Sequence, residues 1–391
     1  MKAILLLGTI AALMAPCLWD SDTLDTELRG LPDAFDLVTG RWHRHGEAYY
    51  RERIARLGAK PHPTLAELDD LAVAFERVGE RERAVAVMAK KAEALAAAPD
   101  REHEYRRLAN LGTFHAHAGR YDEAVVELRQ AVALNPAAHF GRERLQIRLI
   151  EYAAAARQEP SRWTQQSFLR YAGYPFGSFP SRAFADPAQD GEPTFVDDVE
   201  IDCDLDWDQA YRAVGGMLRF GGREGPELYR ALGELFLEKE HLNLAWWAFR
   251  HAIERDHPAA EVLTQQLARI ADHWREAESV HTMQLAGTGV RAPTEAEYTA
   301  IRASADRWLA TFQELEAAAV ARGEDVASDA TLAALLAEAD RRVPRPAAPR
   351  GWSSLELLLA GLALIAAVVA VHAVHRRRRR RDRTAGAGAY P

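Results

Sequence analysis

Cysteine is scarce in this chain of 391 residues, which contains only Cys17 and Cys203. Two cysteines cannot build a disulfide framework, and no Cys-x-x-Cys pair indicates a zinc site. One bridge between them is possible outside the cytoplasm, but their spacing does not decide it. The sequence also lacks a glycine-rich phosphate loop, a Gly-x-Ser-x-Gly elbow and a His-Glu-x-x-His helix. It therefore predicts no catalytic centre, no cofactor and no metal ion.

Alternating runs of valine, isoleucine and threonine are also scarce, whereas alanine, leucine, glutamate and arginine dominate. This composition favours helices over strands and predicts an all-α fold. The net charge of -8 is unevenly distributed: the last 16 residues hold seven Arg and one Asp, while residues 1–375 hold 42 Lys and Arg against 56 Asp and Glu. Such an acidic body repels phosphate backbones, so we expect no nucleic-acid partner.

Both ends of the chain have the composition of targeting or membrane segments. Residues 1–17 contain one lysine and then an apolar run that ends in small residues, which is typical of a signal peptide. A lipid attached to Cys17 is an alternative. Residues 352–375 are largely apolar and precede six consecutive arginines. We therefore predict one C-terminal transmembrane helix, a basic cytoplasmic tail at 376–391, and a main domain outside the cytoplasm.

Between these ends, small and apolar residues recur at the spacing of paired helices. In the clearest segment they are Leu111, Gly112, Gly119, Tyr121, Ala124, Leu128, Ala131 and Pro136. A looser segment has Leu71, Ala72, Phe75, Gly79, Ala84 and Met88, with Lys91 where a small residue is usual, and a third has Leu232, Gly233, Phe236, Ala245, Phe249 and Ala252. Glycine and alanine at these places let two antiparallel helices approach closely, which predicts a stack of helical hairpins.

This pattern resembles the 34-residue tetratricopeptide repeat, and the resemblance implies a solenoid of helical hairpins. The expected organisation is a signal peptide at 1–17, an N-terminal cap segment at 18–64, two repeat-like units at 65–138, a degenerate repeat at 139–225 with an aromatic and acidic insertion at 158–205, a third unit at 226–259, closing helices at 260–343, a proline-rich spacer at 344–351, the transmembrane helix at 352–375 and the tail at 376–391.

The residues after the signal-like segment resemble the opening of a group of secreted bacterial tetratricopeptide-repeat proteins that begin Cys-Leu-Trp-Asp-x-Asp-Thr. The matching residues are Cys17, Leu18, Trp19, Asp20, Asp22, Thr23, Thr39, Gly40, Arg41, Tyr49 and Tyr50. The resemblance supports architecture. With the topology predicted from the arginine run, we expect the main domain on the outer side of a bacterial cytoplasmic membrane. The resemblance does not imply a reaction.

Repeat solenoids present a concave surface built mostly from the first helix of each unit. By analogy with the family, this groove would include Asp69, Glu76, Arg77, Arg106, Thr113, His117, Arg230, Glu234 and Glu238. A groove of mixed charge suits a peptide or protein segment. The sequence therefore predicts a non-enzymatic, membrane-anchored scaffold for protein–protein interactions.

Other candidate sites have plainer structural interpretations. The acidic segment 197–208 has the carboxylates that calcium prefers, but it lacks the pattern of an EF-hand loop and is also typical of a solvated segment before a helix. The pairs His43/His45 and His115/His117 contain metal-binding side chains, and His115 falls at a packing position of the repeat. Two alternatives to a scaffold stay open: a solute- or metal-binding accessory protein, and an enzyme with an unrecognised site.

Overall fold

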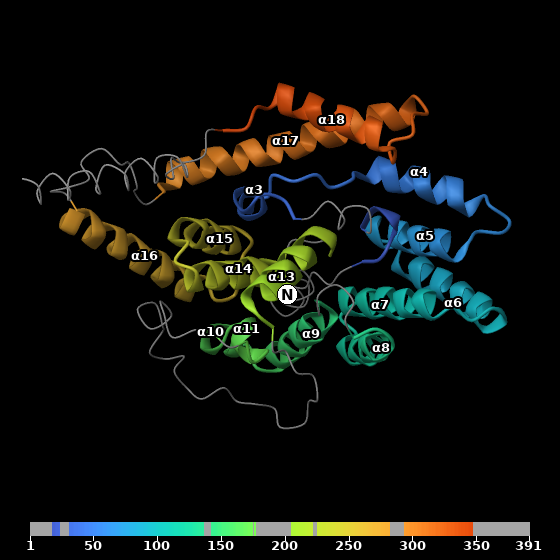
Figure 1. Cartoon of the computed structure of the whole chain (residues 1–391), viewed down its shortest axis with the longest axis horizontal. Coiled ribbons are helices and arrows are strands. Elements are labelled where there is room, and N and C mark those ends of the chain that lie inside the picture. The colour runs from blue at the N-terminus through green and yellow to red at the C-terminus, as the bar shows by residue number, and fades with distance from the viewer. Residues whose placement is uncertain are drawn as a thin grey trace, which may run out of the picture. The chain divides into compact units, whose positions relative to one another are not determined.

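A computed structural model describes residues 18–23, 31–136, 142–174, 176, 205–221, 225–281 and 293–346. These residues form helices, turns and loops with no strand among them, so the predicted all-α fold is confirmed for the described part of the chain. The helices are α3 (Ala34–Thr39), α4 (Glu47–Gly58), α5 (Leu65–Arg77), α6 (Arg81–Ala97), α7 (Arg101–His117), α8 (Tyr121–Leu134), α9 (Arg142–Gln158), α10 (Arg162–Gln165), α11 (Phe168–Tyr171), α13 (Trp207–Phe220), α14 (Pro226–Glu238), α15 (Leu242–Glu254), α16 (Ala260–His281), α17 (Glu295–Ala321) and α18 (Asp329–Arg342) (Figure 1).

The chain divides into two compact units. One unit holds residues 1–274 and 293–345, and the other holds residues 275–292 and 346–391. In the second unit, the structure describes the last turns of α16 and Pro346. All the contacts reported below lie within the first unit.

Several sequence predictions fall on residues that the structure does not describe. The signal-like segment 1–17, the apolar segment 352–375 and the basic tail 376–391 are among them, as are both cysteines and residues 197–204 of the acidic segment. Across the described ranges, no helix is both long enough and apolar enough to cross a bilayer.

Three pairs of consecutive helices pack against each other: α5 with α6, α7 with α8, and α14 with α15 (Figure 1). In each pair, three residues join the two helices. The middle residue of the joint has a positive φ in all three pairs: Gly79 at 82°, Gly119 at 74° and Glu240 at 59°. The three predicted hairpins are therefore present and share one turn geometry.

The close approach predicted at the glycines is also present. A Cβ atom on Gly112 would lie 2.7 Å from Cγ of Leu128 and 3.0 Å from the carbonyl oxygen of Ala124. A Cβ atom on Gly233 would overlap the ring of Phe249. A larger side chain at either glycine would push the two helices of its pair apart.

The remaining predicted helices are confirmed with ends shifted by a few residues. The degenerate repeat expected at 139–225 contains α9 and α13, which pack together. The closing helices expected at 260–343 are α16, α17 and α18. Capping explains where two of these begin, because Asp206 and Thr294 each accept a hydrogen bond from the backbone N–H three residues on.

The closing helices return to the N-terminal region. Helix α17 contacts both α3 and α4 (Figure 1). At the C-terminus of α3, the imidazole Nδ1 of His251 donates to the carbonyl of Val38 at 2.8 Å, and Arg302 donates to the carbonyl of Thr39. Burial lowers the pKa of His251 well below its ordinary value, with Arg302 acting in the same direction, so the ring is neutral. These bonds satisfy helix-end carbonyls that would otherwise be unpaired.

Candidate functional site

The segment Leu18–Thr23 lies inside the helical unit, against α7 and α13. The side-chain amide of Asn110 binds both backbone groups of Trp19: its Oδ1 accepts from the N–H at 2.7 Å and its Nδ2 donates to the carbonyl at 2.9 Å. The N–H of Leu18 donates to the carbonyl of Phe220 at 3.3 Å. Leu18 and Trp19 are 1% and 4% exposed. The segment is therefore fixed by backbone bonds and by burial of its apolar side chains.

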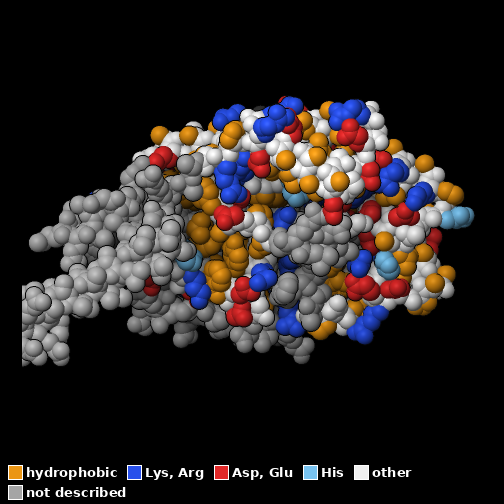
Figure 2. Space-filling model, turned by 45° about the horizontal axis from the view of Figure 1, so that its top comes forward, with side chains coloured by type: hydrophobic (Ala, Val, Ile, Leu, Met, Phe, Trp, Pro, Cys, Tyr) orange, Lys and Arg blue, Asp and Glu red, His pale blue; other side chains and the backbone are white. Residues whose placement is uncertain are grey.

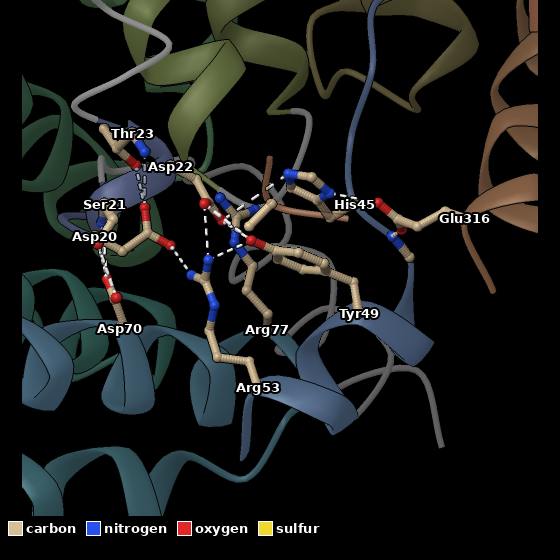
Figure 3. Close-up of polar contacts among 12 residues, drawn as sticks. Asp20, Ser21, Asp22, Thr23, His45, Tyr49, Arg53, Asp70, Arg77 and Glu316 are labelled. Carbon is tan, nitrogen blue, oxygen red and sulfur yellow. Dashed lines mark hydrogen bonds and ion pairs between the residues drawn. The ribbon is translucent and has the colours of Figure 1, made fainter. Parts of the chain in front are cut away.

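The two acidic side chains of this segment converge on one arginine of α4 (Figure 3). The guanidinium of Arg53 lies 3.2 Å from Asp20 and 2.7 Å from Asp22, and its own side chain is 3% exposed. The hydroxyl of Tyr49 also donates to Asp22, at 2.8 Å. On the other side of the segment, Ser21 donates to Asp70 of α5 at 2.8 Å. These bonds join the N-terminal segment to α4 and α5.

Burial affects the ionisation of these carboxyl groups differently. It raises the pKa of Asp20 to about 6, with the neighbouring Asp22 acting in the same direction. Burial also opposes ionisation of Asp22, but Arg53 and His45 outweigh it and lower the pKa of this group. The two carboxyl groups therefore titrate far apart, although they share one counterion.

His45 connects the same cluster to the closing helices. Its Nδ1 is hydrogen-bonded to Glu316 of α17, which also accepts from the N–H of Gly46 at 2.7 Å (Figure 3). The ring stacks on Tyr49 with 3.8 Å between centroids, and its Nε2 lies 3.9 Å from Asp22. The ring of His43 is 5.9 Å away in an edge-on arrangement. In the described ranges, no group of three or more His, Cys, Asp or Glu residues is arranged to hold a metal ion.

A cavity of about 330 Å³ adjoins this cluster. Its wall comes from the N-terminal segment, residues 43–50 (the loop before α4 and the first turn of α4), and the C-terminal ends of α5 and α13, with one residue from α17. The lining residues are Asp20, Asp22, Thr23, His43, Arg44, His45, Glu47, Tyr50, Arg77, Val78, Arg219, Phe220 and Gln313. Three acidic residues and three arginines therefore line the same space.

Arg77 is the member of the predicted groove that lines this cavity. It donates to the carbonyl of Phe220 at 3.0 Å, and its Cζ lies 5.8 Å from the centre of the Tyr50 ring. Its Nε is buried without a hydrogen-bond partner, and it makes no ion pair with any described residue. Arg77 thus brings a positive charge to the cavity that the described carboxylates do not bind directly.

The structure places five of the nine predicted groove residues in the interior. They are Asp69, Glu76, Thr113, His117 and Arg230. Arg77, Arg106, Glu234 and Glu238 are half-buried. The expectation that all nine line an open groove is therefore corrected at the five buried positions.

Each corrected position has a bonding partner within the chain. Both oxygens of Asp69 lie 2.6 Å from Nζ of Lys91, the residue that departs from the repeat pattern. His117 is bonded to Glu76 at 2.9 Å, and Gln146 donates to Thr113 at 3.1 Å. Polar side chains on the first helices therefore bind neighbouring helices.

The same holds at the third helical pair. Arg230 donates to the carbonyl of Trp163 at 2.7 Å and forms an ion pair with Glu234 at 3.2 Å. Glu238 accepts a hydrogen bond from the hydroxyl of Tyr174 at 3.0 Å. Trp163 and Tyr174 belong to the described part of the aromatic insertion and are buried, as expected for aromatics that pack on the helices. Residues 177–204 of the insertion lie outside the described residues.

The sequence patterns did not identify Arg53, Asn110 and Glu316, which hold the N-terminal segment and the loop before α4. One signal for Arg53 was available, because it lies four residues after Tyr49 and therefore on the same face of a helix. No local pattern connects Asn110 with Trp19 across 91 residues, or Glu316 with His45 across 271.

Comparisons of this chain with protein-family models, with curated proteins and with solved structures find no match. Function is therefore inferred from the side chains around the cavity, from the spacing of the helical pairs, and from the apolar and arginine-rich runs of the sequence.

Proposed function

We propose that this chain is a non-enzymatic scaffold in a bacterial cytoplasmic membrane, with a tetratricopeptide-like domain outside the cytoplasm that binds a segment of a partner protein. Residues 352–375 form the anchor and 376–391 its cytoplasmic tail, on the basis of the apolar run and the six arginines that follow it. Three helical pairs with the same joint length and turn geometry support the repeat interpretation.

The observation that carries the proposal is the cavity beside Leu18–Thr23. Residues from five parts of the chain line it, and most of them are polar or charged. Arg77, which the repeat pattern places on the binding face, is on its wall. Such a wall suits a polar segment of a protein better than an apolar ligand, since each charged group of the segment finds an opposite charge.

A solute-binding accessory protein is the second candidate, and one observation favours it. Asp20, Asp22 and Thr23 belong to the segment that resembles the secreted proteins, and all three line the cavity. The cavity's volume of about 330 Å³ lies at the lower end of the range that small-molecule sites occupy. Both candidates use the same cavity wall. In the first the bound group belongs to a partner protein, and in the second it belongs to a free solute.

Capture of the partner from native membranes tests the proposal. The full-length chain and two variants, Arg77→Glu and Arg56→Glu, would be crosslinked in membranes, purified and compared by quantitative mass spectrometry. Arg56 is the matched control, because it lies on the exposed side of α4 and pairs with Glu52 at 3.1 Å. We expect Arg77→Glu to reduce capture of one protein by about tenfold, since reversing a charge at a binding wall costs about 1.4 kcal/mol or more.

The control variant should capture as much of that protein as the wild type. Because Arg77→Glu also loses the hydrogen bond to Phe220, capture is compared at a temperature at which circular dichroism shows both variants to be folded. Equal capture by Arg77→Glu and the wild type would refute the proposal that the cavity is the binding site.

A further inference from the structure

One wall of the cavity carries an excess of negative charge. Asp20 and Asp22 line it, and Asp70 lies just behind, bonded to Ser21. Arg53 makes ion pairs with the first two carboxylates, and one guanidinium offsets only one of them. Burial raises the pKa of Asp70 as well as that of Asp20, and Asp22 raises both further. A cation placed on this side would relieve that repulsion.

The imidazole of His45 does not remove this excess. Its Nε2 lies 3.9 Å from Asp22, but its Nδ1 is bonded to Glu316, which is itself a buried carboxylate. The acidic wall keeps room for an external hydrogen-bond donor, because the side chain of Asp22 is 22% exposed.

The cavity lining also carries positive charge. Arg77 lines it with a buried Nε that has no partner and no ion pair to a described residue. Arg44 lines it too, with its guanidinium 4.3 Å above the ring of Trp42. Burial lowers the pKa of Arg44 to about 10, and the nearby Arg255 and Arg302 act in the same direction. An anion placed beside these arginines would be stabilised by them.

We propose that the cavity binds a ligand that carries an ammonium group and a carboxylate group close together, with the ammonium at Asp20 and Asp22 and the carboxylate at Arg77. A free amino acid, a dipeptide and a chain end with both charges share this chemistry. The inference rests on the binding function proposed above and adds the class of ligand.

A ligand with one charge satisfies this cavity less well. A simple anion would leave Asp20 and Asp22 with Arg53 as their one shared guanidinium, and a simple cation would leave Arg77 without a counterion. An ammonium group donates three hydrogen bonds and suits the carboxylate oxygens, whereas a carboxylate accepts paired bonds from a guanidinium. Tyr50, Val78 and Phe220 also line the cavity and provide apolar surface for a short carbon skeleton.

Calorimetric titration of the purified full-length chain in detergent tests the inference. The probe is dialanine, which has both charges; the comparison probes are N-acetyl-dialanine, which has only the carboxylate, and dialanine amide, which has only the ammonium. We expect saturable binding of dialanine and at least tenfold weaker binding of each blocked probe. Acetyl-Ala-Ala-Lys carries both charges at one chain end, on the lysine side chain and the terminal carboxylate. Tighter binding of this probe than of dialanine would indicate the chain end of a partner protein, and tighter binding of dialanine would indicate a free solute.

Variants then locate the binding site. Arg77→Gln and Asp22→Asn should each weaken dialanine at least tenfold, while Arg56→Gln on the exposed side of α4 should not. If Asp22→Asn fails to fold because Arg53 loses a partner, Arg77→Gln and the blocked probes still decide the question.

The inference is overturned if neither dialanine nor acetyl-Ala-Ala-Lys binds at millimolar concentration, or if the blocked probes bind equally well. It is also overturned if Arg77→Gln leaves binding unchanged. Should Arg77→Glu abolish partner capture while no probe binds, the scaffold proposal stands and the ligand class is wrong. Should dialanine bind in the expected way while no partner depends on Arg77, the ligand class stands and the solute-binding candidate replaces the scaffold.

Discussion

Replacing Lys91 with methionine would leave a buried carboxylate without its counterion in the first helical pair. The side chains of Lys91 and Asp69 are 0% and 3% exposed, and both carboxylate oxygens lie 2.6 Å from Nζ. The other groups near Asp69 are weak substitutes: Nδ2 of Asn110 is 3.4 Å away and Nδ1 of His103 is 3.7 Å away. Removing one partner of a buried pair costs about 3–5 kcal/mol, so we expect Lys91→Met to lower the free energy of unfolding by about that amount.

Urea unfolding of the full-length chain in detergent, followed by its helical circular dichroism, measures this loss. Lys90→Met is the matched control, because Lys90 is exposed on the same helix, and it should change the free energy by less than about 0.5 kcal/mol. The double variant Lys91→Met/Asp69→Leu should recover most of the loss, since no charge is then left buried. A loss below about 1 kcal/mol in the single variant, or no recovery in the double variant, would refute the reasoning, because both results require a solvated Asp69.

Three further predictions concern packing, pH and topology. Gly233→Ala should destabilise the chain by about 1–3 kcal/mol by overlap with Phe249, whereas Gly58→Ala, which has open space around it, should not; equal thermal shifts would contradict this packing. Burial raises the pKa of Asp20 to about 6 in the folded state from its ordinary 3.8, so between these pH values the folded state binds more protons than the unfolded state. The free energy of unfolding should therefore fall as pH rises from about 4 to 6. Asp20→Asn should flatten that part of the stability curve in urea titrations, and an unchanged slope would count against a buried, repelled carboxyl group. Protease added to spheroplasts should digest residues 18–351 and leave a short C-terminal fragment, whereas a protected domain would exclude the proposed topology.

The sequence was sufficient to predict the helices and their pairing, because those depend on local periodicity. Gly112 and Gly233 correctly indicated the close contacts between helices. Glycine destabilises the middle of a helix, so its presence there indicates that another helix lies too close for a larger side chain. Glycines at the joints, such as Gly79 and Gly119, marked the turns for a related reason: only glycine adopts a positive φ there without strain.

The candidate site was not predictable to the same degree, because it depends on contacts between residues far apart in sequence. The repeat analogy places first-helix polar residues on an open face, but here the N-terminal segment binds Asp70 of α5 and Asn110 of α7. Helix α17 also returns to the N-terminal region, where it packs on α3 and α4. A solenoid in which each unit contacts only its neighbours has no such return. Asp69 shows a second reason: its partner is Lys91 on the next helix, a residue that departs from the repeat pattern.

Basic and acidic side chains are intermixed over the face of the molecule shown in Figure 2, so the surface in view offers no extended patch of one sign for a partner. Two carboxyl groups whose pKa burial raises, Asp20 and Asp70, instead lie at or beside the cavity, part of whose wall is formed by Leu18–Thr23. That segment is held by Asn110, whose amide also approaches Asp69 at 3.4 Å, and Asp69 is held by Lys91. A buried ion pair of the first helical pair is thus two hydrogen bonds away from the segment that lines the proposed site.

Lys91→Met should therefore loosen the segment Leu18–Thr23 and weaken dialanine binding even in molecules that remain folded. Gly233→Ala, at the distant third pair, should instead lower stability and leave the affinity of the folded molecules unchanged. Equal loss of affinity in the two variants would show that binding follows global stability and that the chain from Lys91 to Trp19 has no special role.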